Sequence, residues 1–259
     1  MKVCLLIGFE YTGNMFLPGI EQDLIQISKL VSQIQPDRLT VLSDISSKKL
    51  QDLGILQETK TLSFKKFKST RKFLKIISRT VTHSDEVFLY YTGHAKRGNF
   101  LLPNDDKVKM SKLRTLLTQN TNPNSEILCL LDCCESTGLN LGFELTKHVK
   151  QTSKSPKASH KKIICISSSS EGQRSICTKS GSVFTTQLCK RLRKRKLELG
   201  PDLREMIVDK LHKTFKKKLG IKVTSCGIFE KEFGIASMVL ITLSRPDLVE
   251  IWPWCVGKN

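Results

Sequence analysis

Two stretches decide the fold, Phe88–Ala95 (FLYYTGHA) and Glu126–Gly138 (EILCLLDCCESTG). Each begins as an apolar run of strand length and ends on polar residues, a pattern typical of a buried strand in a parallel sheet. In an open parallel sheet, ligands bind beyond the carboxyl ends of the strands. If the two strands are neighbours, His94 and Cys134 therefore meet at one edge of the sheet.

Further apolar runs alternate with helical patterns along the rest of the chain. This order predicts an α/β fold, in which helices cover a mostly parallel, six-stranded sheet. The expected strands are Val3–Phe9, Arg38–Ser43, Glu86–Thr92, Glu126–Asp132, Lys162–Ser168 and Ala236–Leu243. The expected helices are Glu21–Gln35, Lys68–Thr80, Ser111–Gln119, Val183–Arg193 and Asp202–Lys218.

The chain is strongly basic, with 43 Lys and Arg against 24 Asp and Glu residues and a formal net charge of +19. Such a charge attracts polyanions, so nucleic acid is an alternative partner. Lys190–Lys196 (KRLRKRK) could form a nucleic-acid patch or a nuclear signal. Positive charge also suits the C-terminal end of a helix, and we favour this interpretation.

The apolar runs, such as Met238–Leu243, are far shorter than the ~18 residues that a membrane span requires. The stretch Met1–Gly13 lacks the long apolar core of a secretory signal. We therefore expect a cytoplasmic protein, with the nucleus as an alternative, and no membrane partner. The nine cysteines include no CxxC pair, so we expect neither a disulfide framework nor a zinc site, and no cofactor.

The histidine and the cysteine offer nucleophilic chemistry, because an imidazole can take the proton of a neighbouring thiol and the thiolate can attack a carbonyl. Side chains two residues apart on a strand share a face. Thr92 is therefore expected on the face of His94, and the Asp132 carboxylate on that of Cys134. The same alternation directs Cys133, the alternative nucleophile, to the opposite face.

The motifs YYTGH (Tyr90–His94) and LLDCCES (Leu130–Ser136), in this order, resemble the histidine and cysteine boxes of the caspase-like cysteine peptidases. Within that clan the chain is similar to the metacaspases and paracaspases, because Asp132 stands two positions before the cysteine. The resemblance covers roughly residues 1–195 and implies a caspase-like three-layer α/β/α sandwich. It also includes the stretches Leu5–Leu24, Gly98–Asp106 and Lys162–Ser175.

The resemblance implies a role for each matching residue. It implies Cys134 as the nucleophile and His94 as the general base, with the backbone N–H groups of Cys134 and Ala95 as the oxyanion hole. It further implies that the pocket for a basic P1 side chain, the residue before the cleaved bond, is formed by Asp23, Thr92 and Asp132. The implied substrates are proteins or peptides cleaved after Arg or Lys.

Three departures from the family pattern stand in the sequence. Ala95 replaces a glycine after the histidine, and Glu135 replaces a histidine after the nucleophile. The segment Val108–Lys112 (VKMSK) lacks the acids that bind calcium in many metacaspases, so no metal site is expected. The first two departures motivate an alternative function, an inactive relative that serves as a binding or regulatory module.

The lysine-rich, serine-rich segment 150–162 is expected to be an exposed linker. It divides a single peptidase domain, residues 1–259, into two parts. Residues 1–149 would correspond to the large subunit of the family and residues 163–259 to the small one.

Overall fold

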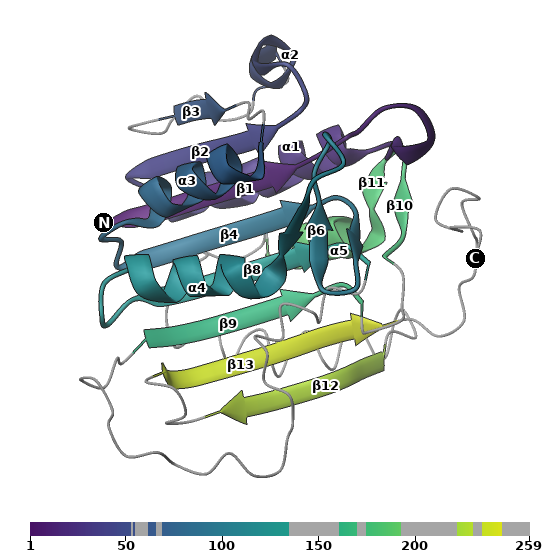
Figure 1. Ribbon diagram of the computed structural model, residues 1–259. Helices are drawn as coiled ribbons and strands as arrows, with labels where there is room; N and C mark the ends of the chain where they lie inside the picture. The colour runs from purple at the N-terminus through teal and green to yellow at the C-terminus, as the bar shows by residue number, and fades with distance from the viewer. Residues whose placement is uncertain are drawn as a thin grey trace.

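A sheet of eight strands forms the centre of the molecule (Figure 1). In the computed structural model, residues 1–52, 54, 62–65, 69–134, 161–169, 175–192, 222–229 and 235–244 are described. The strands lie in the order β12 (Lys222–Phe229), β13 (Ile235–Ser244), β9 (Lys161–Ser167), β8 (Glu126–Asp132), β4 (Glu86–Thr92), β1 (Lys2–Gly8), β2 (Arg38–Ser43) and β3 (Leu62–Lys65). Every neighbouring pair is parallel except β12 and β13.

The predicted fold class is confirmed, and all six predicted strands are present, but the sheet has eight strands and not six. The two additional strands, β3 and β12, are the edges of the sheet. An edge strand has one neighbour and needs no continuous apolar run, so its signal in the sequence is weak. The predicted linker also ends earlier, because β9 begins at Lys161.

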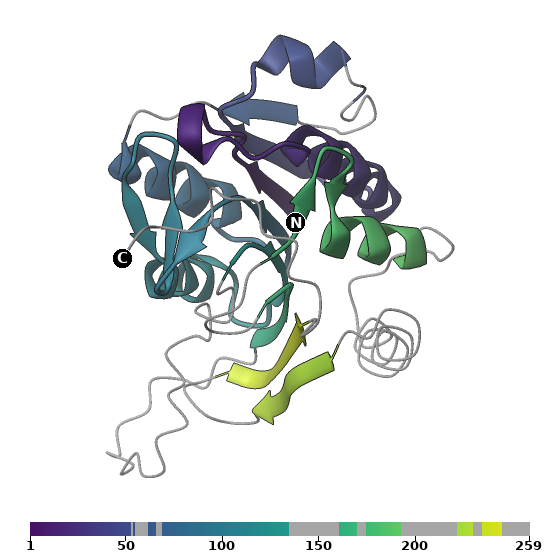
Figure 2. The same ribbon diagram turned by 90° about the vertical axis from the view of Figure 1, so that its right-hand side faces the viewer.

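Helices cover both faces of the sheet, as Figure 2 shows. On one face α1 (Ile20–Val31), extended by the turn η2 (Ser32–Ile34), packs beside α5 (Val183–Leu192). On the other face α3 (Thr70–Val81) packs beside α4 (Met110–Asn120). Alternate residues of β1 serve the two layers, since Cys4 and Leu6 lie in the α1–α5 core and Leu5 and Ile7 in the α3–α4 core.

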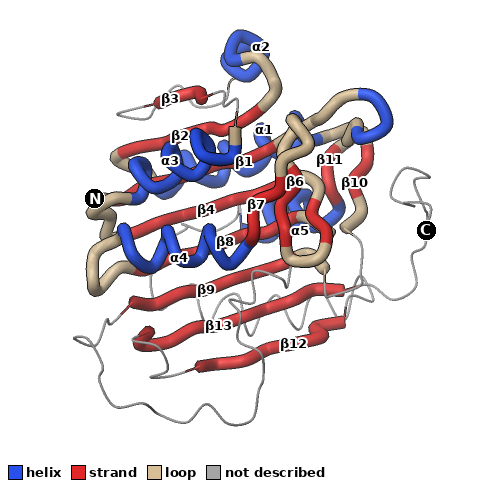
Figure 3. Tube along the Cα trace, in the orientation of Figure 1, coloured by secondary structure: helices blue, strands red, loops and turns tan. Residues whose placement is uncertain are grey.

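Several short elements were not predicted. They are η1 (Gly13–Met15), α2 (Ser47–Asp52), the small sheet of β5 (Ala95–Lys96), β6 (Asn99–Leu101) and β7 (Lys107–Lys109), and the hairpin of β10 (Cys177–Thr178) and β11 (Gly181–Ser182). The small sheet and the hairpin stand at the end of the central sheet where β4 and β8 finish (Figure 3). They therefore surround the edge at which the sequence places the site.

Some predictions concern residues outside the described ones, namely the helix Asp202–Lys218, Glu135, and residues 150–160 of the linker. Within the described part of the chain, no helix has the length and apolar character to cross a membrane.

Candidate active site

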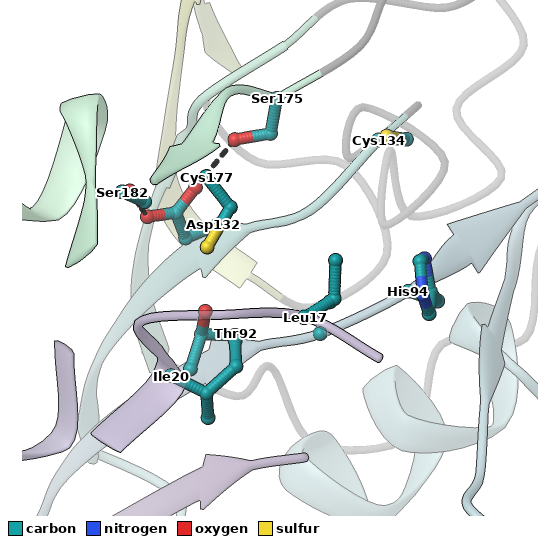
Figure 4. A pocket seen from close by; sticks show the side chains of 10 residues that line it. Leu17, Ile20, Thr92, His94, Asp132, Cys134, Ser175, Cys177 and Ser182 are labelled. Carbon is teal, nitrogen blue, oxygen red and sulfur yellow. Dashed lines mark hydrogen bonds between the residues drawn. The ribbon is translucent and has the colours of Figure 1, made fainter. Parts of the chain in front are cut away.

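The two motif strands are direct neighbours, and their ends meet as predicted. Thr92, the last residue of β4, is the register partner of Asp132, the last residue of β8. His94 and Cys134 each follow two residues later, and both line one pocket. Figure 4 shows them on one side of this pocket, with Asp132 on the other side. The pocket is also lined by Leu17, Ile20, Gly93, Ser175, Cys177 and Ser182.

The His94 ring is held in one tautomer. Its Nε2 lies 2.8 Å from the backbone oxygen of Met15. A carbonyl oxygen only accepts, so Nε2 carries the hydrogen and Nδ1 keeps a lone pair. Burial lowers the pKa of His94 below its ordinary value of 6.5, although the bond to Met15 opposes this shift. The ring is therefore mostly neutral at pH 7, the state in which Nδ1 can accept a proton.

The two adjacent cysteines differ in their surroundings. Cys133 is buried in the α3–α4 core, and burial raises its pKa well above the ordinary value for a thiol. Cys134 is half-buried and lines the pocket. The hydroxyl of Ser169 donates to the Cys133 carbonyl oxygen at 2.8 Å, which anchors the chain just before Cys134. The arrangement favours Cys134 as the reactive thiol, because a thiol that stays protonated is a poor nucleophile.

Ala95, the residue after the histidine, begins the short hairpin of β5 and β6. It faces Phe100 in the ladder, between the pair His94–Leu101 and the pair Lys96–Asn99. Hydrogen-bonded and non-hydrogen-bonded pairs alternate in an antiparallel ladder, and Ala95 occupies a non-hydrogen-bonded position. Its N–H is therefore directed away from β6 and takes no part in this ladder.

Asp132 is a buried carboxylate surrounded by hydroxyl donors. Its Oδ1 accepts from Ser175 at 2.6 Å, and its Oδ2 accepts from Thr185 at 2.6 Å and from Ser182. The Thr185 hydroxyl has one proton, which it gives to Asp132, so the hydroxyl of Tyr90 donates to Thr185 at 2.6 Å. Burial raises the pKa of Asp132, and the hydrogen bonds that the hydroxyl groups donate to it oppose this rise.

Asp23 is fully buried in the first turn of α1 and lies one layer behind the pocket wall. Its carboxylate accepts from the Ser182 N–H at 2.7 Å and from the Thr92 hydroxyl at 3.3 Å, and both of these residues line the pocket. Burial, and then the nearby charge of Asp132, raise its pKa well above the ordinary value. A Cβ at Gly181 would come within 2.6 Å of Asp23 Oδ1, so only glycine allows the hairpin to approach this closely.

Ser175, Ser182 and Thr185 were missed by the sequence analysis. Ser182 alone had a local signal, because a serine directly before an apolar helical pattern is typical of a helix N-cap. Its Oγ does accept from the Thr185 N–H at 3.1 Å, at the start of α5. The described residues contain no cluster of three or more His, Cys, Asp or Glu side chains that could hold a metal ion.

Comparison with known proteins gives one family. Residues 1–231 match the family model described as the caspase domain. A comparison with curated proteins finds no match.

Proposed function

Because this chain belongs to the caspase-domain family of cysteine peptidases, we propose that it is an endopeptidase that cleaves after Arg or Lys. One observation carries the proposal. The pocket lined by Cys134 and His94 is also lined by the buried carboxylate of Asp132, with Asp23 behind it. A nucleophile, a base and an acidic pocket are the parts that such a reaction needs.

The reaction begins with proton transfer from the Cys134 thiol to Nδ1 of His94. The thiolate sulfur attacks the substrate carbonyl carbon, a C–S bond forms, and the charge on the oxygen is stabilised by the N–H groups of Cys134 and Ala95. The C–N bond then breaks, and His94 gives its proton to the departing amine. A water molecule, deprotonated by His94, hydrolyses the acyl-enzyme.

The acidic side of the pocket supports selection of a cationic P1 side chain. Leu17 and Ile20 provide apolar surface for an aliphatic stem, and Asp132 provides the charge for its end. A buried carboxylate without a cation is unfavourable, so a guanidinium or ammonium group gains by pairing with it. The planar guanidinium can bond to a carboxylate through two N–H groups, and we expect Arg to exceed Lys.

The test is the kcat/KM of matched fluorogenic peptides that differ only at P1, with Arg, Lys, Leu or Asp. We expect the order Arg, Lys, Leu and Asp, with no turnover by Cys134→Ala. A preference for Asp at P1 would refute the basic pocket. An arginyl electrophile that labels Cys134 would distinguish an active peptidase from an inactive binding module, since an inactive module would stay unlabelled.

A further inference from the structure

The hydroxyl of Tyr11 replaces a missing backbone hydrogen bond in the hairpin that follows His94. In the pair His94–Leu101, the Leu101 N–H donates directly to the His94 carbonyl oxygen at 3.0 Å. The return bond is replaced by a bridge, because the His94 N–H donates to Tyr11 Oη at 2.9 Å and Tyr11 Oη donates to the Leu101 oxygen at 2.8 Å. The His94 N–H therefore depends on one inserted hydroxyl, that of Tyr11, while the Tyr91 hydroxyl donates to the His94 carbonyl oxygen at 2.8 Å.

The ring of Tyr11 also contacts the imidazole itself. The two ring centroids are 4.7 Å apart, with an angle of 50° between the ring planes. The glycine before His94 permits this close approach, since a Cβ at Gly93 would lie 2.9 Å from Tyr11 Oη. Tyr11 thus contacts both the backbone and the ring of His94.

Tyr11 is held in an uncommon backbone conformation by Asp44. Its φ is +60°, in the left-handed region that a bulky residue rarely adopts. The Asp44 carboxylate accepts from the N–H of Glu10 at 2.9 Å and from the N–H of Tyr11 at 2.7 Å. Two consecutive charge-assisted bonds of this kind stabilise the turn and aim the Tyr11 ring at the site.

The same loop supplies the second contact to the imidazole. The Leu17 N–H donates to the Glu10 oxygen at 2.8 Å, so residues 10–17 form a closed loop. This loop contains Met15, whose carbonyl oxygen binds His94 Nε2. Asp44 anchors the start of this loop, so it supports both the Tyr11 contact and the Met15 contact to His94.

We propose that Tyr11 is a positioning residue for the general base His94, and that Asp44 acts on His94 through Tyr11 and its loop. The proposal rests on the proposed function, in which His94 Nδ1 takes the proton of Cys134. In this proposal neither residue gives or takes a proton or binds the substrate. Both act by keeping Nδ1 aimed at the thiol.

The first test compares Tyr11→Phe with Tyr90→Phe on an arginyl peptide. Each variant deletes one tyrosine hydroxyl, but Tyr90 contacts the Asp132 network and not His94. A misplaced catalytic group costs up to about 100-fold, so Tyr11→Phe should lower kcat about 10- to 100-fold with KM nearly unchanged. Tyr90→Phe should mainly raise KM. A kcat of Tyr11→Phe within about twofold of wild type would overturn the proposal.

The second test is a double-mutant cycle between Tyr11→Phe and Asp44→Ala, with Asp52→Ala, an exposed acid at the end of α2, as the control. If Asp44 acts through Tyr11, the kcat of the double variant should be only slightly lower than that of the less active single variant. If the two substitutions lower kcat independently, so that the double variant shows the product of the two single effects, Asp44 does not act through Tyr11.

Alkylation of Cys134 by iodoacetamide measures the same pairing without peptide cleavage. The base promotes thiolate formation, so the alkylation rate should fall in Tyr11→Phe and in Asp44→Ala, and stay unchanged in Asp52→Ala. Equal rates in all four proteins would overturn the role of Tyr11. If no peptide is cleaved but these alkylation rates still differ as expected, the proposed function fails and the positioning role stands.

Discussion

Tyr90 and Tyr91 are neighbours in the chain, yet their hydroxyls serve opposite sides of the site. Tyr90 donates to Thr185, which donates to Asp132, on the acidic side. Tyr91 donates to the His94 carbonyl oxygen at 2.8 Å, on the side of the base. They diverge because successive side chains of a strand point to opposite faces of the sheet.

The two sides are built from different materials. On the acidic side, hydroxyl and backbone N–H donors surround the two buried carboxylates, Asp132 and Asp23. On the base side, the Met15 backbone oxygen and the Tyr11 ring contact the imidazole, and the Tyr11 and Tyr91 hydroxyls bond to the His94 backbone. The comparison teaches that the acidic side should decide which substrates react, whereas the base side should decide how fast any substrate reacts.

The largest effect is expected from the reacting pair. Cys134→Ala and His94→Ala should each lower kcat by at least about 1,000-fold, because the thiol and its base act as a unit. Cys133→Ala should retain most activity, since its side chain only packs in the α3–α4 core. The measurement is kcat on an arginyl peptide. If Cys133→Ala is inactive and Cys134→Ala is active, Cys133 is the nucleophile and Cys134 is not.

The next effect separates the two sides directly. Asp132→Ala should lower the ratio of kcat/KM for arginyl over leucyl peptides about 1,000-fold, because a pocket charge without its partner costs about 3–5 kcal/mol. Tyr91→Phe should slow both peptides equally and leave the ratio unchanged. An Asp132→Ala variant that keeps its preference for Arg would contradict the division between the sides.

A smaller effect is expected in the stability of the acidic side. Burial holds the pKa of Asp23 in the folded protein above its ordinary value. The stability that the neutral side chain contributes is therefore complete below about pH 3.8 and is lost as the pH rises through the raised pKa. Asp23→Asn keeps the neutral form at every pH and can still accept from Ser182. Its melting temperature at pH 7 should exceed that of wild type by about 2–4 °C for each kcal/mol of burial cost and repulsion that the substitution removes.

The control for this prediction is the same comparison near pH 3, where both proteins carry a neutral side chain at residue 23 and the difference should shrink. Binding of an arginyl inhibitor to Asp23→Asn should weaken at pH 7. A variant that melts below wild type at pH 7 would show that the carboxylate stabilises the folded protein.

The smallest effect concerns calcium on the base side. The acid nearest the expected calcium segment, Asp106, already accepts from the N–H and the hydroxyl of Thr70 and from Asn104, at the start of α3. Calcium requires six to eight oxygen ligands, so treatment with a chelator should change kcat/KM by less than about twofold. Steep activation when calcium is added back would refute this expectation.

The sequence predicted the interior of the fold better than its borders. Strands such as β4 and β8 were predicted to the residue, because strands buried on both faces are continuous apolar runs. The edge strands β3 and β12 lack this signal and were missed. In the site, His94, Cys134 and Asp132 were predicted to lie together because the ends of neighbouring strands converge, and all three line one pocket.

The sequence by itself determined the six inner strands of the sheet, the order of the motifs and the residues at the two strand ends, because periodicity and apolar runs are local properties of the chain. Only the tertiary structure decided which groups surround those residues. Ser182 meets Asp23 across 159 positions of sequence, and Tyr11 meets His94 across 83. In the first pair the Ser182 backbone N–H donates to the Asp23 carboxylate, and in the second the Tyr11 hydroxyl accepts from the His94 N–H. Such groups bond to any suitable partner that packing brings within about 3 Å, so no local pattern could name these partners.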